Sequence, residues 1–285
     1  MKSVIVLSEK SSGSTAIQDL LAKFADLKHV QHTHHWAFET LYWSLAASIL
    51  EMPQTKIPDS VVPVPKVAAR DELIALVRNN SHDFIPPQDD KDLVMNGWRH
   101  LCEAHAPIFL EKSPHHLCQQ SSLDLIAQWM DVNNDIDTVL IGLVRNPMDT
   151  IYSQYARWRA RPEALEGQWR TAYKNLLTLK DRVGDRVYII RYEDLIQSTS
   201  VMEPVFNAIG VEADLADHNH MHQKSIQKWR ADNAFGFALS EETITLAEQY
   251  GYQRTDMHNQ PTPLWPLRRE ATRVGYKIKA KLGFA

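Results

Sequence analysis

The chain has 285 residues, of which 44% are hydrophobic and 23% are charged, and its formal net charge is −4. This composition is typical of a globular protein, and the weak negative charge excludes a general attraction to nucleic acid. Cys102 and Cys118 have no metal-binding or redox spacing, which favours free thiols in a reducing compartment. No apolar run approaches the roughly 20 residues that span a bilayer, and the first strand begins almost at Met1, which leaves no room for a signal peptide. We therefore expect a cytoplasmic enzyme or binding protein.

The first 24 residues predict a buried strand, a loop of small residues and an amphipathic helix. Such a loop leaves backbone N–H groups unpaired, and the helix adds the positive end of its dipole, so the two together bind a phosphate-sized anion. Lys10 adds a positive charge. Ser14 follows Gly13, so the loop lacks the G-x-x-x-x-G-K-[ST] spacing of a Walker A motif. We predict a phosphate loop of another type, with an ordinary capped helix as the alternative.

A histidine-rich segment follows this helix. Residues 29–33 predict a short second strand, and residues 34 to about 50 predict a helix. This would place His32, His34, His35 and Glu39 near the carboxyl edge of the sheet, where open α/β proteins bind ligands. Three interpretations remain open: solvated or core histidines, a metal site of unrecognised spacing, or a catalytic base that titrates near neutral pH.

The middle of the chain predicts an insertion within one domain that covers residues 1–285. Four prolines make residues 51–66 a long irregular loop, which is either a lid, an acceptor-binding edge or a connector. Residues 67–80 and 91–106 predict helices. The strand from 107 to 114 then ends in a charged turn, where Lys112 is well placed to meet an anion unless it is merely solvated.

Residues 137–144 predict a buried strand that is followed by a helix over 148–161. Ser153 and Arg157 share one face of that helix, and Arg145 lies at its start. Two guanidinium groups and a hydroxyl would bind a phosphate well. An ion-paired helix surface is the alternative.

The last third of the chain predicts a helix over 163–182, a strand over 186–192 and a helix to about residue 209. In the basic stretch 224–230, Lys228 could meet a phosphate, while Trp229 or Tyr192 could stack on a base; a solvated helix start is as good an interpretation. The alternating histidines at 218, 220 and 222 allow a metal hypothesis.

The tail from about 267 to 285 predicts a basic amphipathic helix, with six basic residues against one acidic residue. Such a helix either packs on its parent domain or contacts an anionic membrane surface weakly.

Taken together, these segments resemble the sulfotransferases. R-N-P-x-D-x-x-x-S-x-Y, from Arg145 to Tyr155, is similar to their 3′-phosphate motif, and K-S-S-G-S-T resembles their 5′-phosphosulfate loop with Lys10 one position early. F-L-E-K-S-P and V-Y-I-I-R-Y-E-D-L resemble two further segments of the family. The resemblance runs from about residue 3 to 250. It is closer to the bacterial and tyrosylprotein-type branch, because the R-K-G-x-x-G-D-W-K segment of the cytosolic aryl branch is missing.

The resemblance implies transfer of the sulfuryl group of 3′-phosphoadenosine 5′-phosphosulfate (PAPS) to a hydroxyl acceptor, with 3′-phosphoadenosine 5′-phosphate (PAP) as product. The residues implied in donor binding are Ser11, Ser12, Gly13, Ser14 and Thr15 for the 5′-phosphosulfate, Arg145, Ser153 and Arg157 for the 3′-phosphate, and Tyr192 and Lys228 as further nucleotide contacts. Lys10 or Lys112 would neutralise the leaving oxygen. His34 is our first choice for the base, with Glu39 and His115 behind it.

The predicted fold is three-layer α/β of the P-loop-NTPase-like type: a mostly parallel sheet of about five strands with helices on both faces and the site at the strand carboxyl ends. Sulfuryl transfer moves a monoanionic group, and no carboxylate pair suits Mg²⁺, so we expect no metal. The alternatives are a kinase-like phosphotransferase and a non-catalytic PAP- or PAPS-binding protein. The acceptor, a small molecule or a glycan or lipid hydroxyl, is not identified.

Overall fold

The computed structural model describes residues 1–24, 26–57, 60–212, 226–260 and 262–281. Its contacts divide the chain into two compact units: unit 1 comprises residues 1–144 and 172–221, and unit 2 comprises residues 145–171 and 222–285. The expectation of one domain over the whole chain stays a prediction.

Unit 1 is built on a parallel sheet with the strand order β2-β3-β1-β4-β5. The strands are β1 (Lys2–Ser8), β2 (Leu27–Lys28), β3 (Ile108–Lys112), β4 (Asp137–Val144) and β5 (Val187–Arg191). The three central strands are almost wholly buried, as expected of continuous apolar runs in a parallel sheet. The predicted α/β fold with a mostly parallel sheet of five strands is confirmed.

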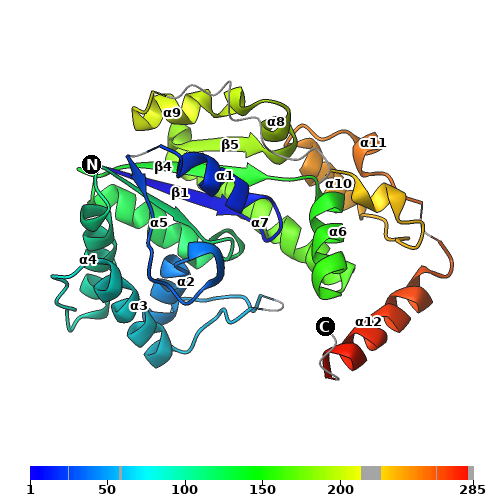
Figure 1. Ribbon diagram of the computed structural model, residues 1–285, viewed down its shortest axis with the longest axis horizontal. Coiled ribbons are helices and arrows are strands. Elements are labelled where there is room, and N and C mark those ends of the chain that lie inside the picture. Colours follow the sequence, from blue (N-terminus) through cyan, green and yellow to red (C-terminus); the bar gives the residue numbers. More distant parts are fainter. Residues whose placement is uncertain (25, 58–59, 213–225, 261, 282–285) are drawn as a thin grey trace. The chain divides into compact units, whose positions relative to one another are not determined.

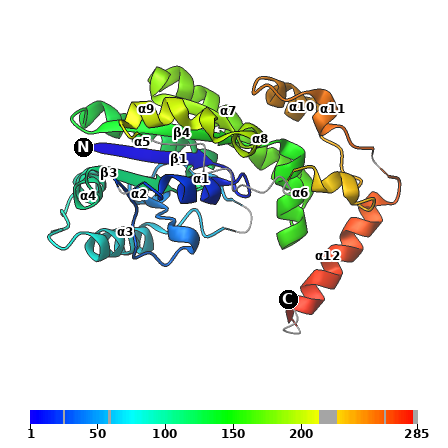
Figure 2. The ribbon, with the colours of Figure 1, turned by 45° about the horizontal axis from the view of Figure 1, so that its top comes forward.

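Helices cover both faces of this sheet (Figures 1 and 2). The helices of unit 1 are α1 (Ser14–Leu21), α2 (Tyr42–Ile49), α3 (Lys66–Asn80), α4 (Asp90–Ala104), α5 (Gln120–Val132), α8 (Tyr192–Gln197), α9 (Glu203–Ile209) and the second half of α7 (Pro162–Val183), and α3 packs on α2 and α4. The chain moves towards the β2 edge through α1 and towards the β5 edge through α5 and α7. Because crossovers are right-handed, this reversal puts α1 on the opposite face from α5 and α7; α1 lies in front of the sheet in Figure 1.

A cluster of buried tryptophans joins the inserted helices to the sheet. The Trp43 and Trp98 ring centroids lie 4.8 Å apart, and Trp98 lies 6.4 Å from Trp129 and 5.1 Å from Phe109 of β3. These rings come from α2, α4 and α5, and all three tryptophans are fully buried. The segment between the Pro-rich loop and β3 is therefore part of the core of unit 1.

Two local predictions about residues 29–50 are wrong. The second strand is Leu27–Lys28 rather than 29–33, because the backbone N–H groups of Gln31 and His32 donate to the side chain of Asn80 on α3. The predicted continuous helix is a short 3-10 turn (η1, Trp36–Phe38) followed by α2. Positive φ angles at Ala37 and Phe38 distort η1, and a further positive φ at Leu41, the N-cap of α2, lies between the two elements.

Unit 2 contains α6 (Pro147–Trp158), the first half of α7, the 3-10 turn η7 (Lys228–Ala231), α10 (Glu241–Glu248), α11 (Arg254–Met257) and α12 (Trp265–Lys281). Phe235 joins α6 to α12 through ring contacts with Tyr152, Tyr155 and Trp265. The predicted C-terminal helix is present up to Lys281, and residues 282–285 lie outside the described residues. Within the described part of the chain, none of the helices has the length and hydropathy needed to cross a bilayer.

Candidate active site

The loop between β1 and α1 has the shape of an anion-binding turn. Gly13 caps α1 with a φ of 94°, and Ser11 also has a positive φ, so the chain turns sharply before the helix begins. No side chain caps the helix at this position. The N–H groups of the first helical turn, from Ser14 and Thr15, lack acceptors within the helix and carry the positive end of its dipole.

Two tyrosines hold this loop in place. A Cβ atom added to Gly13 would lie 2.3 Å from Cε2 of Tyr192, so the Tyr192 ring packs directly on the glycine. The Ser12 hydroxyl lies 3.0 Å from the Tyr173 hydroxyl, which donates to the Leu143 carbonyl of β4. Ser12 is fully buried, so its hydroxyl links the loop to α7 and β4 through Tyr173. Tyr192 was expected at the nucleotide, and Tyr173 was missed because a lone tyrosine within a long helix carries no sequence signal.

The turn after β3 is organised by the buried carboxylate of Glu111. It accepts hydrogen bonds from the hydroxyls of Thr40 (2.7 Å) and Ser113 (2.5 Å), and His116 Nε2 lies 3.3 Å away. Burial acts to raise the pKa of Glu111, but His116 and the two hydroxyls outweigh it and hold that pKa below its usual value. The Ser113 hydroxyl also accepts from the backbone N–H groups of Thr40 and Leu41. This network fixes the chain before α2 against the end of β3.

Lys112 presents its ammonium beside a second carboxylate. Its Nζ lies 3.3 Å from Glu39 Oε1, and His115 Nδ1 lies 3.8 Å from Glu39 Oε2. Burial raises the pKa of Glu39, and Lys112 offsets part of that rise. Burial and the positive charge of Lys10, with smaller contributions that include Lys112, lower the pKa of His115 to about 3. One electrostatic environment at the carboxyl edge of the sheet therefore includes Lys10, Glu39, Lys112 and His115. These residues are among those that the family resemblance implies at the leaving group or as the base.

The first-choice base, His34, lies on the wall of a neighbouring cavity of about 320 Å³. His32, His35, Thr40 and Glu72 also line it. The His34 side chain is 64% exposed, while His35 is mostly buried and pairs with Glu72. Glu72 was missed because it lies on α3, 37 residues from His35.

In unit 2, four of the predicted residues line a second cavity of about 320 Å³. Arg145, Ser153, Arg157 and Lys228 contribute to its walls together with Asp149, Tyr152 and Ala156. Arg145 is buried, whereas Arg157 and Lys228 are exposed. Three cationic side chains and a hydroxyl around one space form a cavity suited to a phosphate dianion.

Local bonds set the shape of this cavity. The Asn146 side chain caps α6 by accepting from Met148 N at 2.9 Å, and Pro147 occupies the first turn. Trp169 Nε1 donates to the Arg145 carbonyl at 3.1 Å. Asp149 accepts from Gln227 N at 2.6 Å, which places η7 and thus Lys228 on the cavity. The role of Asp149 was missed, although it belongs to the quoted motif.

Two further expectations concern Trp229 and the alternating histidines. Trp229 is buried, with an exposed fraction of 2%, so the suggestion that its ring stacks on a base is corrected. The histidines at 218, 220 and 222 lie outside the described residues.

Comparisons with known proteins agree with this arrangement. A family model described as "Sulfotransferase family" matches residues 3–215. A sulfotransferase domain from the curacin biosynthetic pathway superposes with a TM-score of 0.58 at 18% identity and covers 89% of this chain and 99% of its own. A sulfotransferase domain from the Synechococcus PCC 7002 olefin synthase gives a TM-score of 0.58 at 22% identity, with 89% and 95% covered. A search of curated proteins found no match.

Proposed function

The chain belongs to the sulfotransferase family, and from this premise we propose that it transfers the sulfuryl group of PAPS to a hydroxyl acceptor. The observation that carries the proposal is the cavity of unit 2, where Arg145, Ser153, Arg157 and Lys228 converge. The 3′-phosphate distinguishes PAPS and PAP from the common adenine nucleotides, and this cavity offers it two guanidinium groups, an ammonium and a hydroxyl.

The loop of unit 1 would hold the 5′-phosphosulfate. The first-turn N–H groups of α1, with the side chains of Ser11, Ser14 and Thr15, supply donors, and Lys10 supplies charge. Ser12 would contribute through its backbone, because its hydroxyl is already bonded to Tyr173. The Tyr192 ring, packed on Gly13, keeps the loop in its left-handed turn.

In the transfer step, the acceptor oxygen attacks sulfur while the bond from sulfur to the bridging phosphate oxygen breaks in line, and PAP leaves. Lys112, with Lys10, would neutralise the charge that grows on the leaving oxygen. We propose Glu39 as the base that takes the acceptor proton, because its carboxylate lies 3.3 Å from Lys112 and its pKa is raised towards neutrality. His115 is a poor base with a pKa of about 3. The choice of His34 stays a prediction.

The acceptor edge carries exposed aromatic side chains. Trp36 is 80% exposed and Phe38 is 43% exposed, and both lie just before Glu39 in the chain. We therefore propose a small-molecule or lipid-like acceptor whose hydroxyl is attached to an apolar group. The two superposed domains belong to a biosynthetic pathway and to an olefin synthase, which supports a small-molecule acceptor.

The test is calorimetric titration of PAP and of AMP, which lacks the 3′-phosphate, into wild type and Arg145→Ala. We expect micromolar binding of PAP without Mg²⁺, binding of AMP at least tenfold weaker, and at least a tenfold loss of PAP affinity in the variant. Arg161→Ala is the matched control, because Arg161 is exposed in the same unit and does not line the cavity. Equal affinities for PAP and AMP in wild type would contradict the proposal.

Two rivals make different predictions. A kinase-like phosphotransferase would turn over Mg·ATP and bind ATP in preference to PAP. A non-catalytic protein would bind PAP but show no transfer of labelled sulfate from PAPS to any member of a panel of apolar alcohols and phenols. Transfer that is lost in Lys112→Ala would support the enzyme.

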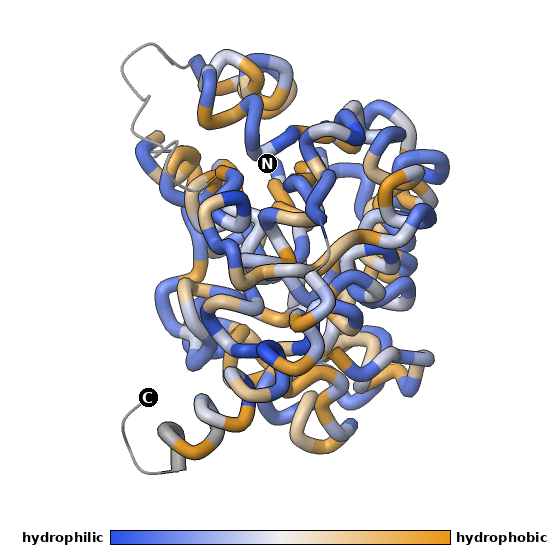
Figure 3. Tube along the Cα trace, turned by 90° about the vertical axis from the view of Figure 1, so that its right-hand side faces the viewer, coloured by the Kyte–Doolittle hydropathy of each residue, from blue (hydrophilic) through white to orange (hydrophobic). Residues whose placement is uncertain are grey.

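We propose the cytoplasm as the location, since Cys102 and Cys118 are both buried thiols. We also propose that α12 makes a weak contact with an anionic membrane surface. The side chains of Leu267, Val274 and Ile278 are exposed on this helix. Figure 3 shows both hydrophobic and hydrophilic residues along its described part. Wild-type protein should float with phosphatidylserine vesicles at low salt, and the Leu267→Ser/Val274→Ser variant should float much less. Equal flotation of the two proteins would contradict the contact.

A further inference from the structure

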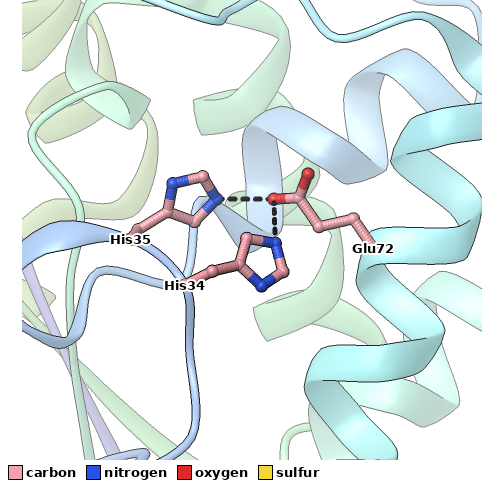
Figure 4. Close-up of side chains that lie close together, drawn as sticks. All are labelled: His34, His35 and Glu72. Atoms are coloured by element: carbon pink, nitrogen blue, oxygen red, sulfur yellow. Dashed lines mark hydrogen bonds and ion pairs between the residues drawn. The ribbon is translucent and has the colours of Figure 1, made fainter.

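A group of three metal-type ligands lies on the wall of the unit 1 cavity, outside the donor chemistry described above. His34 and His35 come from the segment before η1, and Glu72 comes from the middle of α3 (Figure 4). One ligand atom from each residue lies within 4.8 Å of the other two. We propose that these three side chains bind one divalent transition-metal ion of the Zn²⁺ class.

The distances fit such an ion after small side-chain rotations. Glu72 Oε1 lies 2.5 Å from His35 Nε2 and 3.7 Å from His34 Nε2. Tetrahedral zinc with bonds of about 2.0–2.1 Å separates its ligand atoms by about 3.3 Å, and the two observed distances lie on either side of that value. Two imidazoles and one carboxylate are a donor set for Zn²⁺ and its neighbours in the first transition row, whereas Mg²⁺ prefers oxygen ligands alone.

The segment that carries the two histidines is tied to the same helix at a second point. The Asn80 side chain, at the end of α3, accepts from the backbone N–H groups of Gln31 and His32 and donates to the His32 carbonyl at 2.8 Å. The Thr33 hydroxyl accepts from His35 N and donates to the Glu39 carbonyl. These bonds hold His34 and His35 over Glu72 through contacts that do not involve the ligand atoms.

The cavity provides access and an open coordination position. It has a volume of about 320 Å³ and is lined by all three ligand residues and by His32 and Thr33. Three protein ligands on the wall of an open cavity leave room for water or another small ligand on the ion. The site is therefore of the open kind, and His32 adds a further imidazole to the cavity wall.

The experiment is titration of Zn²⁺ into tag-free, chelator-treated protein, followed by calorimetry, with Mg²⁺ as the comparison ion. We expect one Zn²⁺ per chain with micromolar or tighter affinity, little heat with Mg²⁺, and at least a tenfold loss of Zn²⁺ affinity in His35→Gln and in Glu72→Gln. His82→Gln, which removes an exposed histidine outside the cluster, should bind like wild type. Substitution with Co²⁺ adds a second readout, since an ion held by these ligands should give a visible spectrum that is lost in both ligand variants.

Failure of wild type to bind Zn²⁺ more tightly than His35→Gln/Glu72→Gln overturns the proposal, as does an equal loss in His82→Gln. In that case the group is an ordinary hydrogen-bonded pair, His35 with Glu72, beside an exposed histidine. PAP titration of the same variants shows whether each is folded, and its result does not depend on the metal.

Discussion

Glu39 combines a half-buried carboxylate, a raised pKa and a lysine partner, which is the environment of a general base. We predict that Glu39→Gln lowers kcat by about 100-fold or more, the range expected for loss of a positioned base. A base acts when deprotonated, so kcat/KM of wild type should rise with pH through the pKa of Glu39, above the ordinary value of 4.5. That acid limb should vanish in Glu39→Gln.

The competing variant is His34→Gln, assayed with chelator present so that metal binding does not contribute. If Glu39 is the base, the acid limb remains in His34→Gln. Loss of the limb in His34→Gln, with the limb retained in Glu39→Gln, would instead establish the choice that the sequence favoured.

His115 makes the free energy of unfolding depend on pH. Its pKa is about 3 in the folded chain and 6.5 as the ordinary value, because it is buried beside Lys10. A lowered pKa means that the stabilisation is fully present above 6.5 and is lost as the pH falls towards 3. Between pH 7 and pH 4.5, wild type should lose about 2–3 kcal/mol from this group, measured by urea unfolding. His115→Gln should lose less over the same interval, and parallel losses in both proteins would show that His115 does not titrate as described.

At the scale of elements, the β1–α1 turn depends on one glycine. In Gly13→Ala, the new Cβ would lie 2.3 Å from the Tyr192 ring, and the alanine would have to adopt a φ of 94°. The left-handed conformation alone costs roughly 1–2 kcal/mol, and the clash adds to it. We predict a lower melting temperature and at least a tenfold weaker binding of PAP, measured by calorimetry.

Gly167→Ala is the control for this variant. Gly167 lies within α7, and no atom lies within 4 Å of the position that its Cβ would take. It should leave PAP binding unchanged and stabilise the helix slightly. Adding Tyr192→Ala to Gly13→Ala should restore part of the lost stability, because it removes the clash; no restoration would mean that Tyr192 is not the obstacle.

For the whole molecule, donor binding should appear as added stability. A ligand that binds only the folded chain stabilises it by about 2.7 kcal/mol at 100 times its Kd. PAP should therefore raise the unfolding midpoint of wild type in a concentration-dependent manner, with or without Mg²⁺. Arg145→Ala should show a much smaller shift at the same PAP concentration. An equal shift would show that the 3′-phosphate does not bind in the unit 2 cavity.

Much of the fold followed from local pattern. The strand over 137–144 and the helices near 67–80, 91–106 and 163–182 lie within one or two residues of the observed elements. Continuous apolar runs and 3.6-residue periodicity are properties of the chain itself, and they survive in any packing that buries them. The segment 29–50 was predicted wrongly, because side chains distant in sequence, Asn80 and Ser113, bind its backbone there.

The same distinction holds for the site. The motif from Arg145 to Tyr155 and the small-residue loop were evident from the sequence, since each is a local run that a strand end and a helix start hold together. Glu72 beside His35, Tyr192 on Gly13 and Glu39 beside Lys112 join residues 37, 179 and 73 positions apart. No spacing rule connects such pairs. Their proximity, and with it the pKa values of Glu39 and His115, follows from which helices and strands pack together, because burial and neighbouring charges exist only after the chain has folded.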